Sequence, residues 1–187
     1  MEQDTLELGE FRFKVLKDKC TLHALISNAT DYKLFWMINV PCVGSDVKFE
    51  DESVYCWQPK VYHESMMFSC RSWKQLEGKH CVASADDDDP PAIYLYQHLD
   101  LEKSDLFFES RLGAIFNIDW HFSWSGRDGR VRTSVSFAEV TIWLDEVRDE
   151  QSAKHRLQED LDLSEFSSPE IALHPSAGPR FKFKPLP

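Results

Sequence analysis

The stretch from Ala114 to Leu144 predicts two long strands joined by a turn. In its first part the even positions are apolar and most odd positions are polar, and this period of two is typical of a strand with one buried face. The glycine-bracketed loop 126–129 predicts a hairpin turn. The residues expected to share the buried face are Ala114, Phe116, Ile118, Trp120, Phe122, Trp124, Val131, Thr133, Val135 and Phe137.

The position of this loop also predicts a pairing register. With the turn centred on the loop, Trp120 faces Val135 on the second strand. Beyond Phe137 the apolar phase shifts by one residue, which would turn the following apolar side chains out of the core. We therefore expect a β-bulge near Ala138 or Glu139, which would keep the two strands of the hairpin paired with each other.

The remainder of the chain favours a mainly β fold of the β-rich α+β kind. Residues 20–29 fit either a helix or a strand, with the strand preferred, and Leu34 to Val40 is apolar enough for a strand buried on both faces. Several short β-like segments follow between residues 47 and 112. A helix is expected at about 146–163. The sequence thus predicts an antiparallel sheet or open barrel with one C-terminal helix.

The chain has 187 residues, of which 42% are hydrophobic, enough for one domain with a substantial core. We expect residues 1–163 to form a single β-rich domain. Residues 164–187 are expected to form a proline-containing C-terminal tail. Phe181 and Phe183 in this tail could dock as an edge strand, and the tail would otherwise be mobile.

The formal charge of −11 is concentrated in acidic runs. Such a field repels phosphate backbones and anionic membrane surfaces and attracts basic proteins, so we expect a basic protein partner and neither nucleic-acid nor membrane binding. The competing interpretation is that the acidic residues only confer solubility. The acidic residues proposed to contact a partner are Glu50, Asp51, Glu52, Asp86, Asp87, Asp88 and Asp89.

Several features bear on the cellular compartment. The first residues have neither a basic nor an apolar region typical of a secretory signal, and the longest apolar run is too short to span a bilayer. The five cysteines are an odd set without the spacing of a disulfide framework. The sequence therefore predicts a cytoplasmic protein with reduced thiols.

The polar face of the hairpin is the first candidate for catalysis. Asp119 and His121 are two residues apart on a strand, so their side chains point the same way, and the predicted register places them beside Ser136 and Ser134. They could form a general base pair, or a metal site if His98, His63 or Glu109 supplied a third ligand. The alternative is a solvated sheet face with cross-strand hydrogen bonds. No metal and no cofactor is expected.

Other fragments carry weaker chemistry. Cys20-x-x-His23 and His80-Cys81 resemble halves of a zinc site, but neither has a matching second pair. Trp120 and Trp124 could line a ligand pocket inside a barrel, although aromatic side chains are needed equally to fill a sheet core. Phosphate-binding loops, nucleophile elbows and other catalytic motifs are absent from the sequence, which leaves enzyme activity uncertain and disfavoured.

Three functions remain compatible with these observations. The first is a non-catalytic acidic protein that engages a basic protein partner, as an immunity protein or inhibitor does. The second is a small-molecule-binding β-barrel with its ligand against Trp120 and Trp124. The third is a hydrolase that uses Asp119 and His121.

Overall fold

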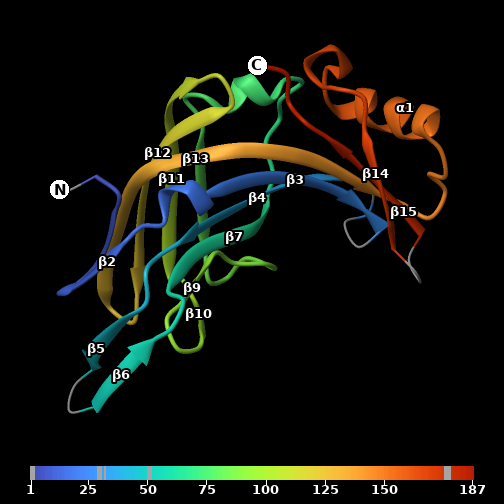
Figure 1. Ribbon diagram of the computed structural model, residues 1–187. Coiled ribbons are helices and arrows are strands. Elements are labelled where there is room, and N and C mark those ends of the chain that lie inside the picture. The colour runs from blue at the N-terminus through green and yellow to red at the C-terminus, as the bar shows by residue number, and fades with distance from the viewer. Residues whose placement is uncertain (1–2, 29–30, 32, 50–51, 175–177) are drawn as a thin grey trace.

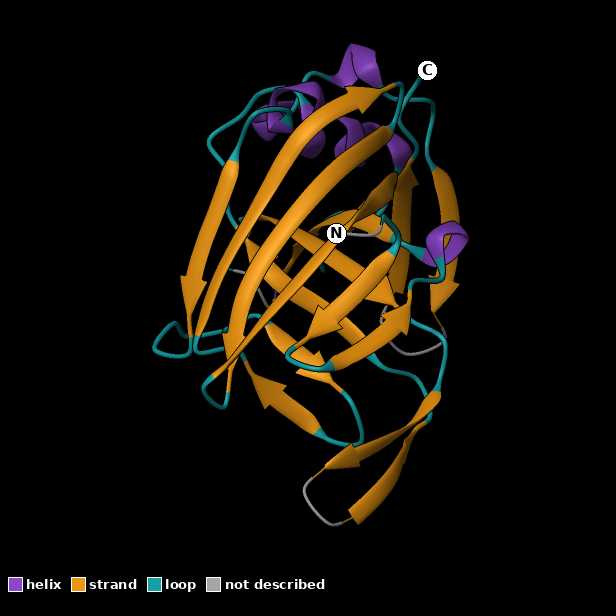
Figure 2. Ribbon diagram, turned by 90° about the vertical axis from the view of Figure 1, so that its left-hand side faces the viewer, coloured by secondary structure: helices purple, strands orange, loops and turns teal. Residues whose placement is uncertain are grey.

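A computed structural model describes residues 3–28, 31, 33–49, 52–174 and 178–187. Most of this part of the chain forms strands, which curve into one large sheet with an additional two-stranded arm (Figures 1 and 2). The strands are β1 (Thr5–Leu8), β2 (Phe11–Lys14), β3 (Thr21–Ser27), β4 (Leu34–Pro41), β5 (Ser45–Phe49), β6 (Glu52–Cys56), β7 (Lys60–Met66), β8 (His80–Ser84), β9 (Ala92–Tyr94), β10 (His98–Asp100), β11 (Lys103–Leu112), β12 (Ile115–Trp124), β13 (Arg127–Trp143), β14 (Glu170–His174) and β15 (Gly178–Phe183). The α-helix is α1 (Glu150–Asp160), and 3-10 turns cover Lys17–Lys19, Trp73–Leu76 and Leu163–Glu165.

Strand β13 organises the sheet because its two halves have different neighbours. Its first half pairs with β12 and β1, and its second half pairs with β3 and β15. From β3 the sheet continues through β4, β7, β9 and β10, and from β12 it continues through β11 to β8. The pairing of β13 with β3 is parallel, so the sheet is mixed, and its ends are not closed into a barrel. The predicted β-rich α+β class is confirmed, and the expected antiparallel pairing holds for the described strands apart from that of β13 with β3.

The hairpin of β12 and β13 is confirmed, but its predicted register is wrong by four residues. Trp120 pairs with Val131 instead of Val135. The turn is made by Ser125 and Gly126, whose φ angles of 47° and 70° are those of a two-residue turn matched to the strand twist. This tight turn extends β13 back to Arg127, into the predicted loop. Because the shift is an even number of residues, the predicted face is kept.

The expected bulge is present at Ala138, but its partner differs from the expectation. The register shifts between Phe137 and Glu139 in the pairing of β13 with β3, whereas the pairing with β12 has already ended at Ser136. The bulge therefore keeps Val140 and the apolar residues after it in the core against β3. The prediction that the bulge preserves the hairpin pairing is wrong.

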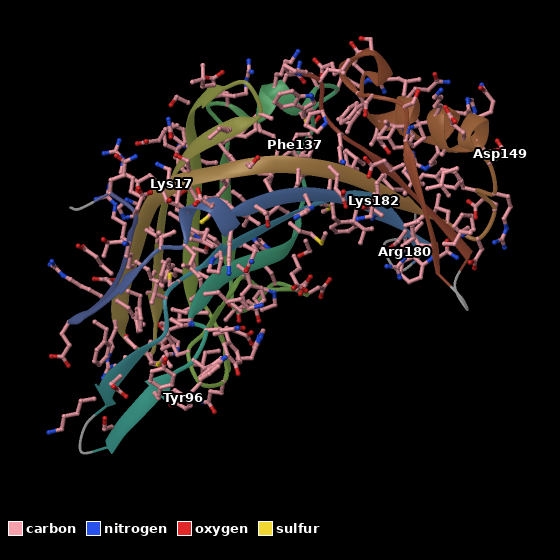
Figure 3. All side chains as sticks on the ribbon, viewed as in Figure 1. Lys17, Tyr96, Phe137, Asp149, Arg180 and Lys182 are labelled. Atoms are coloured by element: carbon pink, nitrogen blue, oxygen red, sulfur yellow. The ribbon has the colours of Figure 1, made fainter. Side chains whose placement is uncertain are left out.

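The sheet core contains the apolar face of the hairpin. Trp120 is fully buried, and its indole N–H donates to Ser104 Oγ at 2.8 Å. Phe137 lies on β13 (Figure 3). Its ring centroid is 5.3 Å from that of Trp36 and 5.4 Å from that of Trp73. The Phe137 contacts pack β13 against β4 and against the 3-10 turn Trp73–Leu76.

Strand β3 confirms the strand preferred for residues 20–29. Strand β4 departs from the expectation that both of its faces are buried. Trp36 and Ile38 on one face are buried, whereas Phe35 and Met37 on the other are only half-buried. The second face of β4 lies on the outside of the sheet, where Phe35 contributes to a surface cleft.

The helix is shorter than the predicted range of about 146–163. Asp149 caps its N-terminus, since its carboxylate accepts from the backbone N–H of Ser152 at 2.8 Å. The predicted pair between Glu150 and Lys154 is present. The residues on either side of α1 pack as non-helical chain, with Val147 and Leu161 buried beside the helix.

The segment after α1 is tied to the sheet. Strand β15 pairs with the end of β13, with Ile142 opposite Phe181, and Phe181 and Phe183 are both buried. Lys182 donates to Glu139 at 2.7 Å, and the Arg180 guanidinium lies 3.9 Å from the centre of the Trp143 ring (Figure 3). Of the two expectations for the tail, docking is confirmed, with β14 added outside β15.

Candidate functional site

The polar pair Asp119 and His121 lies on β12 next to arginines. Arg130 donates two hydrogen bonds to the Asp119 carboxylate, one from Nε to Oδ1 at 2.7 Å and one from Nη2 to Oδ2. His121 Nε2 lies 3.2 Å from the same oxygen. Asp119 faces Arg132 across the strands, so the predicted position beside Ser136 is wrong, as a result of the shifted register.

This arrangement commits the Asp119 carboxylate to a structural ion pair. The hydrogen bond from Arg130 lowers the pKa of Asp119, with partial burial acting in the opposite direction. Glu109, a suggested third ligand, is bound to Arg132 at 2.9 Å. Within the described ranges no group of three or more histidine, cysteine, aspartate or glutamate side chains has the geometry to hold a metal ion.

The two tryptophans proposed as a ligand platform are packing residues of the sheet. Trp120 is enclosed in the core, and Trp124 is 7% exposed, with the guanidinium of Arg127 5.6 Å from its ring centre. Neither tryptophan lines the surface cleft that carries the acidic and other titratable side chains described next.

This cleft lies between β7 and β8, where the sheet is not closed, and we call it the acidic cleft. Its volume is about 650 Å³. Its polar wall includes the predicted acidic loop, and its apolar part comes from β3, β4, β7 and β8. The lining residues are Leu25, Asp31, Lys33, Phe35, His63, Glu64, Ser65, Met66, Met67, Cys81, Val82, Ala83, Asp87, Asp88 and Asp89.

The chain after β8 holds the aspartates at the edge of the acidic cleft. Asp87 Oδ2 accepts from the backbone N–H of Ser84 at 2.7 Å, and the backbone N–H of Asp87 donates to the Ser84 carbonyl at 3.1 Å. Ser65 Oγ of β7 donates to the Asp89 carbonyl at 3.0 Å. The loop is therefore tied to both walls, while Asp86, Asp87 and the following two aspartates keep exposed side chains.

The charge of the acidic cleft is strongly one-sided. Among its described lining residues, the carboxylates are Asp31, Glu64, Asp87, Asp88 and Asp89, and Lys33 is the lysine. Clustered carboxylates around a concave surface focus a negative potential into it and attract cationic groups. Asp86, the first residue of the predicted run, is not part of the lining.

His63 and Cys81 meet inside the acidic cleft, whereas the sequence suggested His63 as a partner of Asp119 and Cys81 as a partner of His80. His63 Nδ1 and Cys81 Sγ approach to 3.9 Å, from β7 and β8 respectively. Burial lowers the pKa of His63 and raises the pKa of Cys81 to about 11, so both groups are neutral near pH 7. A neutral thiol beside a neutral imidazole is a polar floor rather than an activated nucleophile. In the sequence, the available indication is that His63 is two residues from the apolar Val61, so on a strand both side chains point to the same buried face.

His98, also suggested as a ligand for Asp119, belongs to a different group. Its Nε2 lies 2.8 Å from Asp100 Oδ1, and its Nδ1 contacts the Tyr62 hydroxyl. Burial first, and then nearby carboxylates, raise the pKa of Tyr62, so its phenol stays protonated. This exposed chain of hydrogen bonds links β7 to β10.

The two-stranded arm made by β5 and β6 projects from the sheet (Figure 1). Glu50 and Asp51 lie outside the described residues, and Glu52 begins β6. The arm also carries Tyr55, and Trp57 follows it; these side chains are 52% and 71% exposed and their rings contact edge to face. Glu52, the described residue of the second acidic run, is not among the residues that line the acidic cleft.

Comparison of the chain with models of protein families, with curated proteins and with solved structures gave no match. In the part of the chain that the structure describes, no helix has the length and apolar character needed to cross a membrane.

Proposed function

We propose that this chain is a non-catalytic binding protein that holds a basic segment of a protein partner in the acidic cleft, as an immunity protein or inhibitor does. The observation that carries this proposal is the set of Asp87, Asp88 and Asp89 at the edge of a cleft that is also lined by apolar side chains. Lysine and arginine suit such a site because their aliphatic stems pack on apolar surface while their charged ends reach carboxylates. The same negative field disfavours a nucleic-acid partner.

A hydrolase has less support. The Asp119 carboxylate is held by Arg130, and the His63 and Cys81 pair is neutral near pH 7. The small-molecule alternative keeps one supporting observation, because a cleft of about 650 Å³ has the size of ligand pockets. Such a ligand would contact Phe35 and Met66 rather than the tryptophans of the hairpin.

We also propose a cytoplasmic location for the protein. All five cysteines are free thiols, and three of them, Cys20, Cys42 and Cys56, are buried. Reduced thiols are typical of proteins in a reducing compartment.

The test is the binding of a fluorescent lysine-rich peptide, measured by anisotropy at low and high salt. The cleft variant combines Asp87→Asn, Asp88→Asn and Asp89→Asn, which keep a side-chain acceptor in the loop. The control variant combines Glu10→Gln, Asp128→Asn and Glu146→Gln, three exposed positions outside the cleft that change the net charge equally.

We expect the cleft variant to bind at least about tenfold more weakly than the wild type, since three exposed ion pairs of up to about 1 kcal/mol each are lost. The control variant should retain most of the affinity, and the wild-type affinity should fall as salt rises. Equal weakening in both variants would show that net charge, rather than this cleft, attracts the peptide, and would refute the proposed site.

A further inference from the structure

We infer that the basic segment binds as an extended strand that pairs with the free edge of β8. This inference rests on the proposed function and specifies the mode of binding at the same cleft. Among the described residues β8 pairs only with β11, so it ends that side of the sheet. An edge strand presents unpaired backbone groups that can accept another strand.

The direction of the backbone groups of β8 follows from its hydrogen bonds. Phe108 of β11 donates its N–H to the Lys79 carbonyl, so Lys79 and, by alternation, Cys81 and Ala83 face β11. The N–H and carbonyl of Ser84 are bonded to Asp87, which confirms that the intervening residues of the opposite parity face away from β11. The N–H and carbonyl of Val82 therefore point to the free edge.

The chain's own next segment cannot close this edge. A hairpin between β8 and the chain after it would place Pro90 and Pro91 opposite β8, and proline has no N–H to donate. The Pro91 carbonyl is instead bonded to the N–H of Leu101, and β9 pairs with β7 and β10. The sequence thus leaves β8 open beside the acidic cleft.

The surroundings of this edge specify the occupant. Val82 is 77% exposed and Met67 is 62% exposed, and both line the acidic cleft. An added strand would cover these two side chains with apolar residues, and its cationic residues would lie near Asp87 and the aspartates that follow. The occupant that fits is an extended segment in which valine-like and lysine- or arginine-like residues alternate.

The first test uses the synthetic peptide Lys-Val-Lys-Val-Lys-Val-Lys with blocked ends. Two N-methylated forms are compared, one methylated at the valines and the other at the lysines. Successive N–H groups of a strand point to opposite sides, so strand addition requires only one of the two sets. We expect one methylated peptide to bind about tenfold more weakly or worse and the other to bind like the parent. Equal affinities of the two methylated peptides would overturn the inference.

The second test changes the protein with Val82→Pro. This substitution removes the N–H that points to the free edge and leaves the hydrogen bonds between β8 and β11 in place. Proline is tolerated at such edge positions, and Val82→Thr is the matched control because it keeps the N–H and the β-branched shape. We expect Val82→Pro to weaken binding of the parent peptide about tenfold and Val82→Thr to leave it nearly unchanged. If Val82→Pro does not fold, the methylated peptides alone decide.

The outcomes separate the two proposals. If the parent peptide does not bind the wild type at low salt, the proposed function fails and the inference fails with it. If the parent peptide binds wild type and folded Val82→Pro equally well, the acidic cleft remains the site but strand addition to β8 is wrong.

Discussion

Replacing Gly129 with alanine tests the packing between β12 and β13. Gly129 pairs with Phe122, whose ring covers it so closely that an added Cβ would lie 2.1 Å from Cε2 and 2.6 Å from Cζ. Gly129 does not have the positive φ of Gly126, so the backbone itself accepts alanine. The cost of Gly129→Ala therefore comes from displacing the Phe122 ring, which is only 5% exposed and cannot move freely into solvent.

The expected magnitude follows from two opposing terms. Forcing a ring from its packed position costs about 1–3 kcal/mol, while the lower entropy of the unfolded chain returns about 0.4–1 kcal/mol. We expect Gly129→Ala to lower the free energy of unfolding by about 1–2 kcal/mol and Tm by roughly 2–8 °C. In the register expected from the sequence, Gly129 lies in the loop, and the same substitution would not meet the ring.

Urea unfolding followed by tryptophan fluorescence measures this change, and a double-mutant cycle identifies its cause. Phe122→Leu alone should cost below about 1.5 kcal/mol, and in that background Gly129→Ala should lose most of its effect. Neutral or stabilising behaviour of Gly129→Ala in the wild type would refute the pairing of Gly129 with Phe122.

Three further predictions concern other parts of the structure. Asp119→Asn should destabilise the protein by about 1–2 kcal/mol near pH 7. Since the folded pKa of Asp119 is lowered, the difference should be fully present above the unfolded pKa of about 4, shrink as pH falls below that value, and disappear once pH has fallen through the lower folded pKa. An unchanged difference at low pH in acid-series unfolding would contradict this. Alkylation of Cys81, followed by mass spectrometry, should accelerate up to about pH 11, and a fast reaction at pH 7 would refute a neutral thiol. Phe183→Ala should cost about 3–5 kcal/mol in the same unfolding assay, whereas Lys184→Ala, at an exposed ion pair, should have a much smaller effect; similar small effects of both would argue against docking of β15.

Much of the architecture was predictable because local patterns determine it. The alternation around Trp120 identifies β12 and its buried face, and the phase shift after Phe137 locates the bulge at Ala138. The register was not predictable in the same way, because both a two-residue turn at Ser125 and the longer glycine-bracketed loop keep the same face buried. The parallel neighbour β3 was also beyond reach, since it is about a hundred residues away in sequence and no local pattern indicates which strands meet.

The candidate site was predictable only in part. The aspartates of 86–89 were identified by their charge, and three of them line the acidic cleft. The approach of His63 to Cys81 was missed because it depends on which strands border the open edge of the sheet. The pair of Asp119 and His121 was recognised, but its commitment to Arg130 follows from the true register.

The most direct test of the acidic cleft is a nuclear magnetic resonance titration of the ¹⁵N-labelled protein with the parent lysine–valine peptide at low salt. We expect the largest amide shift changes at Met67, Val82 and Asp87 to Asp89, and much smaller changes around Asp119 and along α1. Saturable changes concentrated on the polar face of β12 and β13, or the absence of saturable changes anywhere, would contradict the proposal that this cleft receives a basic segment.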